Sequence, residues 1–283
     1  MREELELNRA HWDEATEIHG RANVYGIEDF KAGLCRLHRV EVEEIGGEVS
    51  GKRLLHLQCH FGLDTLSWAR RGAIVTGVDF SPQGIALAKR LAEETSLPAE
   101  FVCSDLYSLR ENFDAPGKFD IVYASYGVLN WLPDLAGWAA VIEHYLEPGG
   151  FFYIVESHPT ARIFPIDEDM PKAKTFRPFF SYFHDPAGVR WPATADYADA
   201  SALHQVATHE WQHSLSDIIN ALLGAGLALE FVHEFPYCAW PNVAGSVEVE
   251  RFSSSHGYFA PKELPPLPLM FSIRARKPSL GKP

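Results

Sequence analysis

Three short segments of the chain end in side chains that can hold a polar ligand. The first is HLQCHFG at residues 56–62, and the second ends at Asp79. The third is followed by Asp105. A glycine-bearing turn lets backbone N–H groups approach an anionic group, and an acid after the next strand can bond the ribose hydroxyls of an adenosine ligand. Either acid alone could equally form a turn or cap a helix, but their succession favours a ligand site.

Alternating strands and helices must position these segments. The apolar runs that read as strands are 53–57, 73–79, 99–104, 119–124 and 151–156, and the helical patterns between them are 64–71, 81–94 and 135–146. Continuous apolar strands alternating with helices predict an α/β fold with a parallel, doubly wound sheet. Ligands of such sheets bind at the carboxyl ends of the strands, which is where the three segments end.

In order and spacing, these segments resemble the motif series of class I S-adenosylmethionine-dependent methyltransferases. The matching stretches are GKRLLHLQCHFG, GAIVTGVDFSPQGIALAK, FVCSDLY, FDIVYASYGVLNWLPD and YLEPGGFFYIVE, within residues 51–156. The resemblance implies a Rossmann-like, seven-stranded, mostly parallel sheet with flanking helices. Helix 214–223 and strands 227–235 and 267–276 would complete it, with the last strand antiparallel. It also implies S-adenosylmethionine as the cofactor and methyl transfer to a small molecule.

The resemblance places individual residues around the cofactor. From the methionine end to the adenine, these are Gln58, Cys59, His60, Gly62, Ser125, Asp79, Phe80, Asp105 and Leu106. In this assignment Asp79 would hold the ribose, Phe80 would pack on the adenine face, and Asp105 with Leu106 would read the adenine edge. Ser125, just past the fourth strand, would contribute backbone contacts near the amino-acid end. Trp12 and Tyr25 sit where family members close the pocket.

The first loop departs from the family pattern, acid-x-Gly-x-Gly-x-Gly. Here those four positions hold His56, Gln58, His60 and Gly62. A non-glycine residue at positive φ costs about 1–2 kcal/mol, so the turn must differ in detail or carry strain. The new polar groups could bind the methionine carboxylate, or they could serve a function that the standard family lacks.

Methyl transfer depends mainly on holding the nucleophile and the methyl carbon in line. A base is required only where the acceptor is protonated at neutral pH. We nominate His213 and Glu210 for that role, against the alternative that they cap a helix or bond the lid. Tyr126 and Trp131, after the fourth strand, would line the acceptor pocket or else pack in the core.

Composition narrows the partners. The net charge is −13 and no basic run is present, which disfavours a nucleic-acid partner. Adjacent Cys59 and His60 lack the further closely spaced ligands of a zinc site, and we expect no metal. Four scattered cysteines, a charged N-terminus and the absence of an 18-residue apolar stretch predict a cytoplasmic chain that does not span a membrane.

We expect one methyltransferase-type domain over residues 1–283, with an N-terminal helical extension at 1–48 that holds helices 2–15 and 27–45. The cofactor-binding core is 49–156, a lid or substrate insertion is 157–213, and C-terminal core elements fill 214–283. The insertion is rich in aromatic residues, and 197–211 alternates like antiparallel strands. Its aromatic side chains suit an apolar or aromatic acceptor, or a homodimer interface.

Three other functions remain open on the same sequence. The unusual first loop suits a hydrolase or cyclase of natural-product metabolism that keeps the cofactor site. A regulatory subunit or cofactor sensor would need the same site. An NAD-dependent oxidoreductase fits less well, because no dehydrogenase catalytic set is present and Asp105 with the Glu-Pro-Gly-Gly stretch follows the methyltransferase order.

Overall fold

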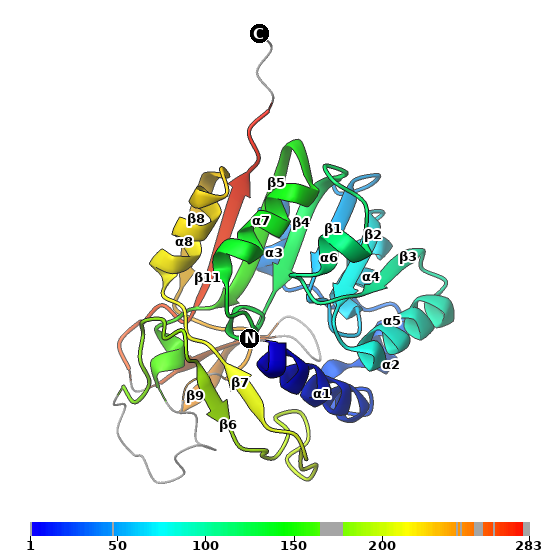
Figure 1. Ribbon diagram of the computed structural model, residues 1–283. Coiled ribbons are helices and arrows are strands. Elements are labelled where there is room, and N and C mark those ends of the chain that lie inside the picture. The colour runs from blue at the N-terminus through cyan, green and yellow to red at the C-terminus, as the bar shows by residue number, and fades with distance from the viewer. Residues whose placement is uncertain are drawn as a thin grey trace.

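A seven-stranded sheet forms the centre of the computed structural model, which describes residues 2–46, 48–164, 178–241, 243, 245–251, 257–262 and 264–279 (Figure 1). The strand order is β3-β2-β1-β4-β5-β11-β8. The bounds are β1 Arg53–Leu57, β2 Ile74–Asp79, β3 Ala99–Cys103, β4 Phe119–Ser125, β5 Leu146–Ser157, β8 Ala228–Phe235 and β11 Met270–Arg276. The first five strands pair in parallel, and β11 runs antiparallel between β5 and β8. The predicted Rossmann-like sheet is confirmed, including its antiparallel last strand.

Helices cover both faces of the sheet. On one face lie α3 Arg39–Ile45, α4 Leu63–Arg70 and α5 Pro82–Thr95, and on the other α6 Leu109–Asn112, α7 Leu135–Tyr145 and α8 Leu215–Gly224. Trp68 and Tyr123 are buried on the first face, whereas Trp138 and Phe152 are buried on the second. The apolar strands therefore lie between two packed layers, as a parallel sheet requires.

The helix after β2 shows how local sequence sets the element boundaries. Ser81 is the N-cap of α5, and its Oγ accepts a hydrogen bond from the Gly84 N–H at 2.9 Å. Pro82 occupies the first helical position, where its missing N–H costs nothing. Ile85, Ala88 and Leu91 fall on the buried face, as the sequence predicts.

The N-terminal extension differs from the prediction in two ways. Helix α1 runs over Arg2–His19, one turn beyond the expected 2–15, and it buries Ala15, Ile18 and His19. The single helix expected at 27–45 is wrong. Two short helices, α2 Ile27–Lys31 and α3 Arg39–Ile45, are separated near Gly33, whose φ of 107° no α-helix accommodates. A 3₁₀ turn, η1 Asn23–Tyr25, precedes α2.

Several smaller elements differ from the prediction in their bounds or were not predicted. Strand β5 begins at Leu146 rather than at 151, because the chain turns into the sheet directly after α7. The antiparallel strands expected within 197–211 are confirmed in part, since β7 Thr208–Glu210 pairs with β6 Val189–Trp191. Strands β9 Ser246–Arg251 and β10 Gly257–Pro261 form a second small sheet, and η2 Leu129–Trp131 and η3 Ala161–Ile163 are 3₁₀ turns.

The carboxyl edge of the parallel strands is covered by α1 and by the β6–β7 pair (Figure 1). Residues 165–177 of the insertion, Phe176 among them, lie outside the described residues. Within the described ranges, every helix is too short or too polar to cross a membrane.

Candidate functional site

The loop between β1 and α4 keeps a tight turn despite its missing glycines. Gln58 and His60 adopt φ values of 56° and 50°, in the left-handed region that glycine favours. Each costs about 1–2 kcal/mol relative to glycine, so the loop stores strain. Position 62 keeps the glycine of the family pattern. Its φ is 77°, and a Cβ there would lie 2.7 Å from the Phe101 ring. The turn is therefore held by the surrounding packing rather than by glycine alone.

Asp79 ends β2 beside this loop and accepts two backbone hydrogen bonds. Its Oδ2 accepts from the His60 N–H at 2.8 Å and its Oδ1 from the Ser81 N–H at 2.9 Å. Burial raises the pKa of Asp79 to about 7, although these backbone bonds act in the opposite direction. Each carboxylate oxygen can accept a further bond, so the predicted ribose ligand has acceptors available here.

Two buried acceptors of the loop lack hydrogen-bond partners among the described residues. They are Gln58 Oε1 and His60 Nδ1. The Gln58 Nε2 group donates to the Val128 carbonyl at 2.9 Å, which carries the side chain across to the segment after β4. Unsatisfied buried acceptors in a native fold call for a partner. The ammonium group at the methionine end of the predicted cofactor would supply a donor for Gln58 Oε1.

The third strand contributes Asp105 and Leu106 through different atoms. Asp105 Oδ1 accepts from the backbone N–H groups of Tyr107 and Ser108 at 2.9 and 3.0 Å, which fixes the turn. The Leu106 side chain is buried in the core beneath α6 and α7, so only its backbone can reach a ligand. Phe80 is half-buried directly after β2.

Ser125, at the end of β4, directs its side chain toward α4. Its hydroxyl donates to Asp64 Oδ2 at 3.1 Å and lies 3.4 Å from His56 Nε2. Burial raises the pKa of Asp64 to about 6 and lowers the pKa of His56 to about 3. The Ser125 side chain is thus engaged, which leaves its backbone for the contact that the resemblance assigns.

The two N-terminal residues expected near the cofactor both reach the first loop. The Trp12 ring lies edge-on to His60, with centroids 5.0 Å apart, and the Tyr25 ring is 5.8 Å from His60. Asp13 ties α1 to the start of α5 by accepting from the Ser81 hydroxyl at 2.6 Å. The N-terminal helix therefore covers the predicted cofactor edge.

Tyr126 and Trp131 do not share one cluster. The Tyr126 hydroxyl donates to Glu41 Oε2 at 3.0 Å, and its ring contacts His38 and Trp240. The Trp131 ring contacts Trp12 at 5.3 Å instead. Of the two predicted acceptor-pocket residues, only Trp131 is connected to the first loop by these ring contacts, because Trp12 contacts both Trp131 and His60.

His213 and Glu210 both have protein partners. His213 Nε2 lies 2.7 Å from the Leu132 carbonyl, and burial lowers the pKa of this imidazole to about 4. Glu210 accepts from Asn130 Nδ2 and from Arg162 Nη2, each at 2.9 Å. These contacts agree with the alternative reading, in which both residues bond the insertion to the core.

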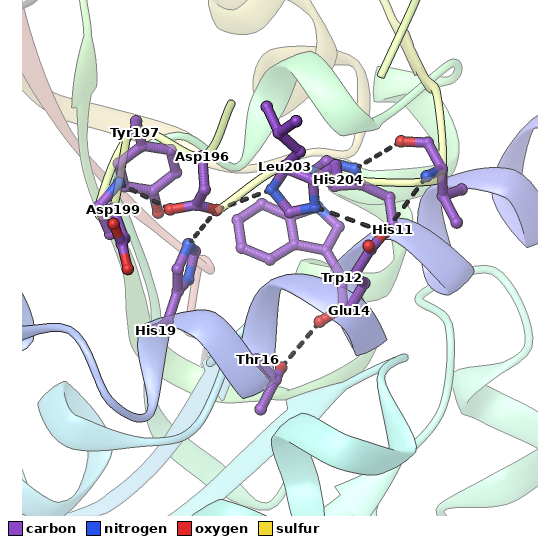
Figure 2. A network of polar contacts seen from close by, with 12 residues as sticks. His11, Trp12, Glu14, Thr16, His19, Asp196, Tyr197, Asp199, Leu203 and His204 are labelled. Atoms are coloured by element: carbon purple, nitrogen blue, oxygen red, sulfur yellow. Dashed lines mark hydrogen bonds and ion pairs between the residues drawn. The ribbon is translucent and has the colours of Figure 1, made fainter. Parts of the chain in front are cut away.

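Three interacting side chains near the loop escaped the sequence reasoning. His19 and His204 each bond Asp196 (Figure 2), and His19 also bonds His60. His19 follows Trp12 by seven positions on α1, so helical spacing could have placed it on the same face. Asp196 and His204 come from the insertion, and local sequence gives no signal for a contact across 177 residues.

The cysteines and a metal site can be judged from the same geometry. All four cysteines lie in the described part of the chain and are free thiols. Burial raises the pKa of the Cys59 thiol well above its ordinary range, which suits an inert packing residue. Across the described ranges, no cluster of three or more His, Cys, Asp or Glu side chains is arranged to hold a metal ion.

Residues 55–154 match the family model of a methyltransferase domain. The chain is 30% identical over 158 residues to a ubiquinone biosynthesis O-methyltransferase of Methylobacterium sp. (strain 4-46), in a match covering 55% of this chain and 61% of that protein. It is 28% identical over 127 residues to the protein of that name from Bordetella pertussis, covering 44% and 52%. The chain therefore matches less than two thirds of the length of these relatives.

Two solved structures share the architecture over most of their length. A S-adenosylmethionine-dependent methyltransferase from Mesorhizobium loti gives a TM-score of 0.54 at 22% identity, covering 87% of this chain and 99% of that one. One described as putative from Listeria monocytogenes gives 0.55 at 18% identity, covering 84% and 96%. At these identities the likeness concerns the fold, and it confirms the Rossmann-like architecture expected from the sequence.

Proposed function

We propose that this chain, whose residues 55–154 form a methyltransferase domain of the class I S-adenosylmethionine-dependent type, transfers a methyl group to a small apolar or aromatic molecule. The family model covers the segment that holds the first loop, Asp79 and Asp105. The two relatives are named O-methyltransferases, which favours an oxygen atom as the acceptor.

One observation carries this proposal: the carboxyl edge of the sheet offers hydrogen-bond acceptors in the order in which S-adenosylmethionine offers donors. We assign Gln58 Oε1 to the ammonium group, Asp79 to the ribose hydroxyls and Asp105 to the adenine amino group. Buried acceptors that lack partners among the described residues bind donors strongly, because an unmade hydrogen bond costs about 1–3 kcal/mol.

The chain's own residues hold and orient the reactants. When bound, the cofactor supplies an activated methyl group on a sulfonium. Asp79 fixes the ribose, and its bonds to the His60 and Ser81 N–H groups fix Asp79. Trp12 covers the loop from α1 and contacts Trp131, which lines the acceptor side. Holding two reactants in line lowers the barrier by removing translational and rotational freedom before the reaction.

Calorimetry tests the cofactor assignment directly. We expect S-adenosylmethionine and S-adenosylhomocysteine to bind and NAD to give no heat. Asp79→Ala should weaken binding at least tenfold, because the ribose loses both acceptor oxygens. Asp114→Ala, an exposed acid far from this edge, is the matched control and should bind as the unaltered protein does. Binding of NAD alone would point to an oxidoreductase.

Release of S-adenosylhomocysteine tests the reaction. The protein is incubated with S-adenosylmethionine and a panel of phenols, carboxylic acids, amines and thiols. We expect turnover with aromatic hydroxyl compounds.

The alternative is a protein that binds the cofactor without methyl transfer, as a hydrolase, cyclase or regulatory subunit. The Gln58 side chain favours this alternative. It extends from the first loop to the Val128 carbonyl, whereas the glycine of the usual family pattern has no side chain there. Tight binding with no product across the panel would support this alternative.

The remaining assignments complete the proposal. Residues 157–213 act as a lid over the acceptor, with 1–48 as a helical cap, 49–156 as the cofactor core and 214–283 as the C-terminal part of the domain. We place the protein in the cytoplasm, on the strength of its free cysteines. Its partner is a small molecule rather than a nucleic acid, and a homodimer through the aromatic insertion remains part of the proposal.

A further inference from the structure

A line of buried polar side chains leads from the first loop into the insertion. Figure 2 shows the part of it from His19 through Asp196 to His204. His60 Nε2 lies 2.9 Å from His19 Nδ1, and His19 Nε2 lies 3.0 Å from Asp196 Oδ2. His204 Nε2 lies 2.7 Å from the same oxygen. The Asp196 carboxylate is buried, with 2% of its surface exposed, and His19 is fully buried. This line joins the cofactor loop, α1 and the insertion.

The carboxylate fixes where the protons lie. A carboxylate only accepts hydrogen bonds, so His19 must carry its proton on Nε2. The Nδ1 atom of neutral His19 is then an acceptor, and His60 must donate to it from Nε2. Neutral His60 consequently has an unprotonated Nδ1. That atom is buried and is the one that has no hydrogen-bond partner among the described residues.

We propose that His60 is the proton acceptor of the methyl transfer and takes the proton of an acceptor hydroxyl on Nδ1, while His19 and Asp196 act as positioning residues that hold its tautomer. This inference rests on the proposed function and deepens it, because it assigns the acceptor to compounds with an ionisable O–H group. A methyl acceptor without a proton to lose would need no such base.

The position of His60 supports this role. Its backbone N–H bonds Asp79, which places the residue at the cofactor edge. Its ring contacts Trp12, whose ring also contacts Trp131, a residue that we predict to line the acceptor pocket. The imidazole therefore lies between the two predicted binding sites. Burial also lowers the pKa of His60 well below its ordinary value, so the base form is present at neutral pH.

The step balances without a further reactant. The acceptor's O–H bond breaks and its proton passes to His60 Nδ1. The oxygen forms a bond to the methyl carbon as the carbon–sulfur bond of S-adenosylmethionine breaks, and the electron pair of that bond remains on sulfur. The positive charge thus moves from the sulfonium to the imidazole. Asp196 stabilises this imidazolium through His19, the role a buried carboxylate has behind a catalytic histidine.

Several other titratable groups face this line and contribute to its pH dependence. From α1 and the turn after it come His11, Asp13, Glu14 and Tyr25, from the strand ends Asp64 and Asp79, and from the insertion Tyr197. The Tyr25 and Tyr197 hydroxyls bond each other, and burial raises the pKa of Tyr25 well above its ordinary value. A pH profile therefore has to be compared between variants rather than read alone.

Nitrogen-15 NMR of the imidazoles tests the tautomer without cofactor or turnover. We expect the wild-type His60 signal to show Nε2 protonated and Nδ1 unprotonated. In Asp196→Asn the amide can donate to His19 Nε2, which reverses the line and places a proton on His60 Nδ1. Asp199→Asn, an exposed acid three residues away, is the control and should keep the wild-type signal. A protonated Nδ1 in the unaltered protein would overturn the proposal.

A further variant tests whether Asp196 sets the tautomer of His60 or only holds the insertion in place. His204→Gln breaks the second bond to Asp196 but leaves His19 paired, so the His60 tautomer should stay as in the wild type. If Asp196→Asn fails to fold, this variant and the wild-type spectrum still decide the tautomer. Equal changes in His204→Gln and Asp196→Asn would mean that the carboxylate only fastens the insertion, which contradicts the proposal.

Turnover with a hydroxyl acceptor from the panel tests the base itself. His60→Gln should lower kcat by about 10²–10⁴-fold, the range of general base catalysis, while calorimetric affinity for S-adenosylmethionine changes by less than a few fold. The rate in this variant should rise with added hydroxide, whereas the wild type reaches a plateau. An unchanged kcat would refute the base. Absence of turnover in every protein would refute methyl transfer instead, and the NMR result would still stand.

Discussion

Gly62 is the residue of the first loop where a side chain cannot fit. A Cβ at this position would lie 2.7 Å from the Phe101 ring and 3.1 Å from the Ala88 Cβ, at a φ of 77°. Gly62→Ala should therefore lower the free energy of unfolding by roughly 2–5 kcal/mol, from backbone strain and overpacking together. Urea denaturation measures this loss.

Gly51 provides the matched control. Its φ of 74° is nearly the same, but among the described residues no atom lies within 4 Å of the place that a Cβ would occupy. Gly51→Ala should cost only the backbone term of about 1–2 kcal/mol. Equal losses in the two variants would show that Phe101 yields, and that packing does not hold the loop.

Glu41 is a buried acid behind the site whose titration acts on stability. Its carboxylate accepts from the His38 N–H and from the Tyr123 and Tyr126 hydroxyls. Burial, with the nearby Asp64 charge, raises the pKa of Glu41 to about 8. Between the ordinary pKa of a glutamate, 4.5, and about 8, the folded state therefore keeps Glu41 protonated while the unfolded state has lost this proton. Glu41 makes its full contribution to the free energy of unfolding below pH 4.5. That contribution falls as the pH rises toward 8, by up to about 1.4 kcal/mol per pH unit.

Glu41→Gln should remove this slope. We expect the free energy of unfolding, measured in urea at about pH 5.5 and about pH 8.0, to fall less with pH in the variant than in the wild type. Asp64 and Asp79, with pKa values raised in the same direction, keep part of the slope in both. Glu43→Gln, at an exposed position on the same helix, should retain the wild-type slope. A slope unchanged by Glu41→Gln would contradict the buried titration.

At the residue scale, the sequence predicted positions better than contacts. Asp79 and Asp105 lie at strand ends because apolar runs and glycine turns fix those ends locally. Tyr126 and Trp131 are five positions apart, yet Tyr126 contacts Glu41 and Trp131 contacts Trp12. A positive φ of 40° at Tyr126 redirects its side chain, and residue types alone do not reveal such a turn.

Helix α1 is the element on which the covered edge depends. Asn8 is fully buried and bridges to β7 through two bonds. Its Nδ2 donates to the His209 carbonyl at 2.6 Å, and its Oδ1 accepts from the His209 N–H at 2.7 Å. Glu14 adds further bonds to the backbone N–H groups of Gln205 and Val206. The helix and the insertion thus cover the edge as a joined pair.

Asn8→Ala should loosen this pair locally. The N–H and carbonyl groups of half-buried His209 lose their partners, at a cost of about 1–3 kcal/mol. We expect hydrogen exchange to quicken in α1 and β7 while β1, β4 and β5 stay protected. Glu17→Ala, on the exposed face of α1, should leave exchange unchanged. Faster exchange spread over the central strands would show that Asn8 supports the whole fold instead.

At the element scale, periodicity succeeded where packing follows local pattern. The strands of the core and α5 were predicted, because burial on both faces demands continuous apolar runs and Ser81 caps the helix. The prediction of one helix over 27–45 was wrong at Gly33, because the apolar residues keep helical spacing across the point where α2 ends and α3 has not yet begun. The last turn of α1 was missed because His19 is buried by Asp196 from the insertion, a contact that no window of sequence contains.

At the scale of the whole molecule, the residues of the predicted site gather at the carboxyl edge of the parallel strands. The loops after β1, β2, β3 and β4 meet there beneath α1 and the insertion (Figure 1). A ligand that binds this edge joins loops from four strands to two covering segments. Since it binds the folded state alone, it stabilises that state by an amount set by its concentration relative to Kd.

S-adenosylhomocysteine should therefore raise the melting temperature of the protein. At a concentration of about 100 times Kd, the ligand adds about 2.7 kcal/mol, which corresponds to a shift on the order of 5 °C or more for a chain of this size. Scanning calorimetry measures it, and NAD at the same concentration should give none. Asp79→Ala should lose about half of the shift or more while keeping a melting transition, because binding weakened tenfold leaves about 1.4 kcal/mol at the same ligand concentration. An equal shift with NAD, or a full shift in Asp79→Ala, would place the ligand elsewhere on the molecule.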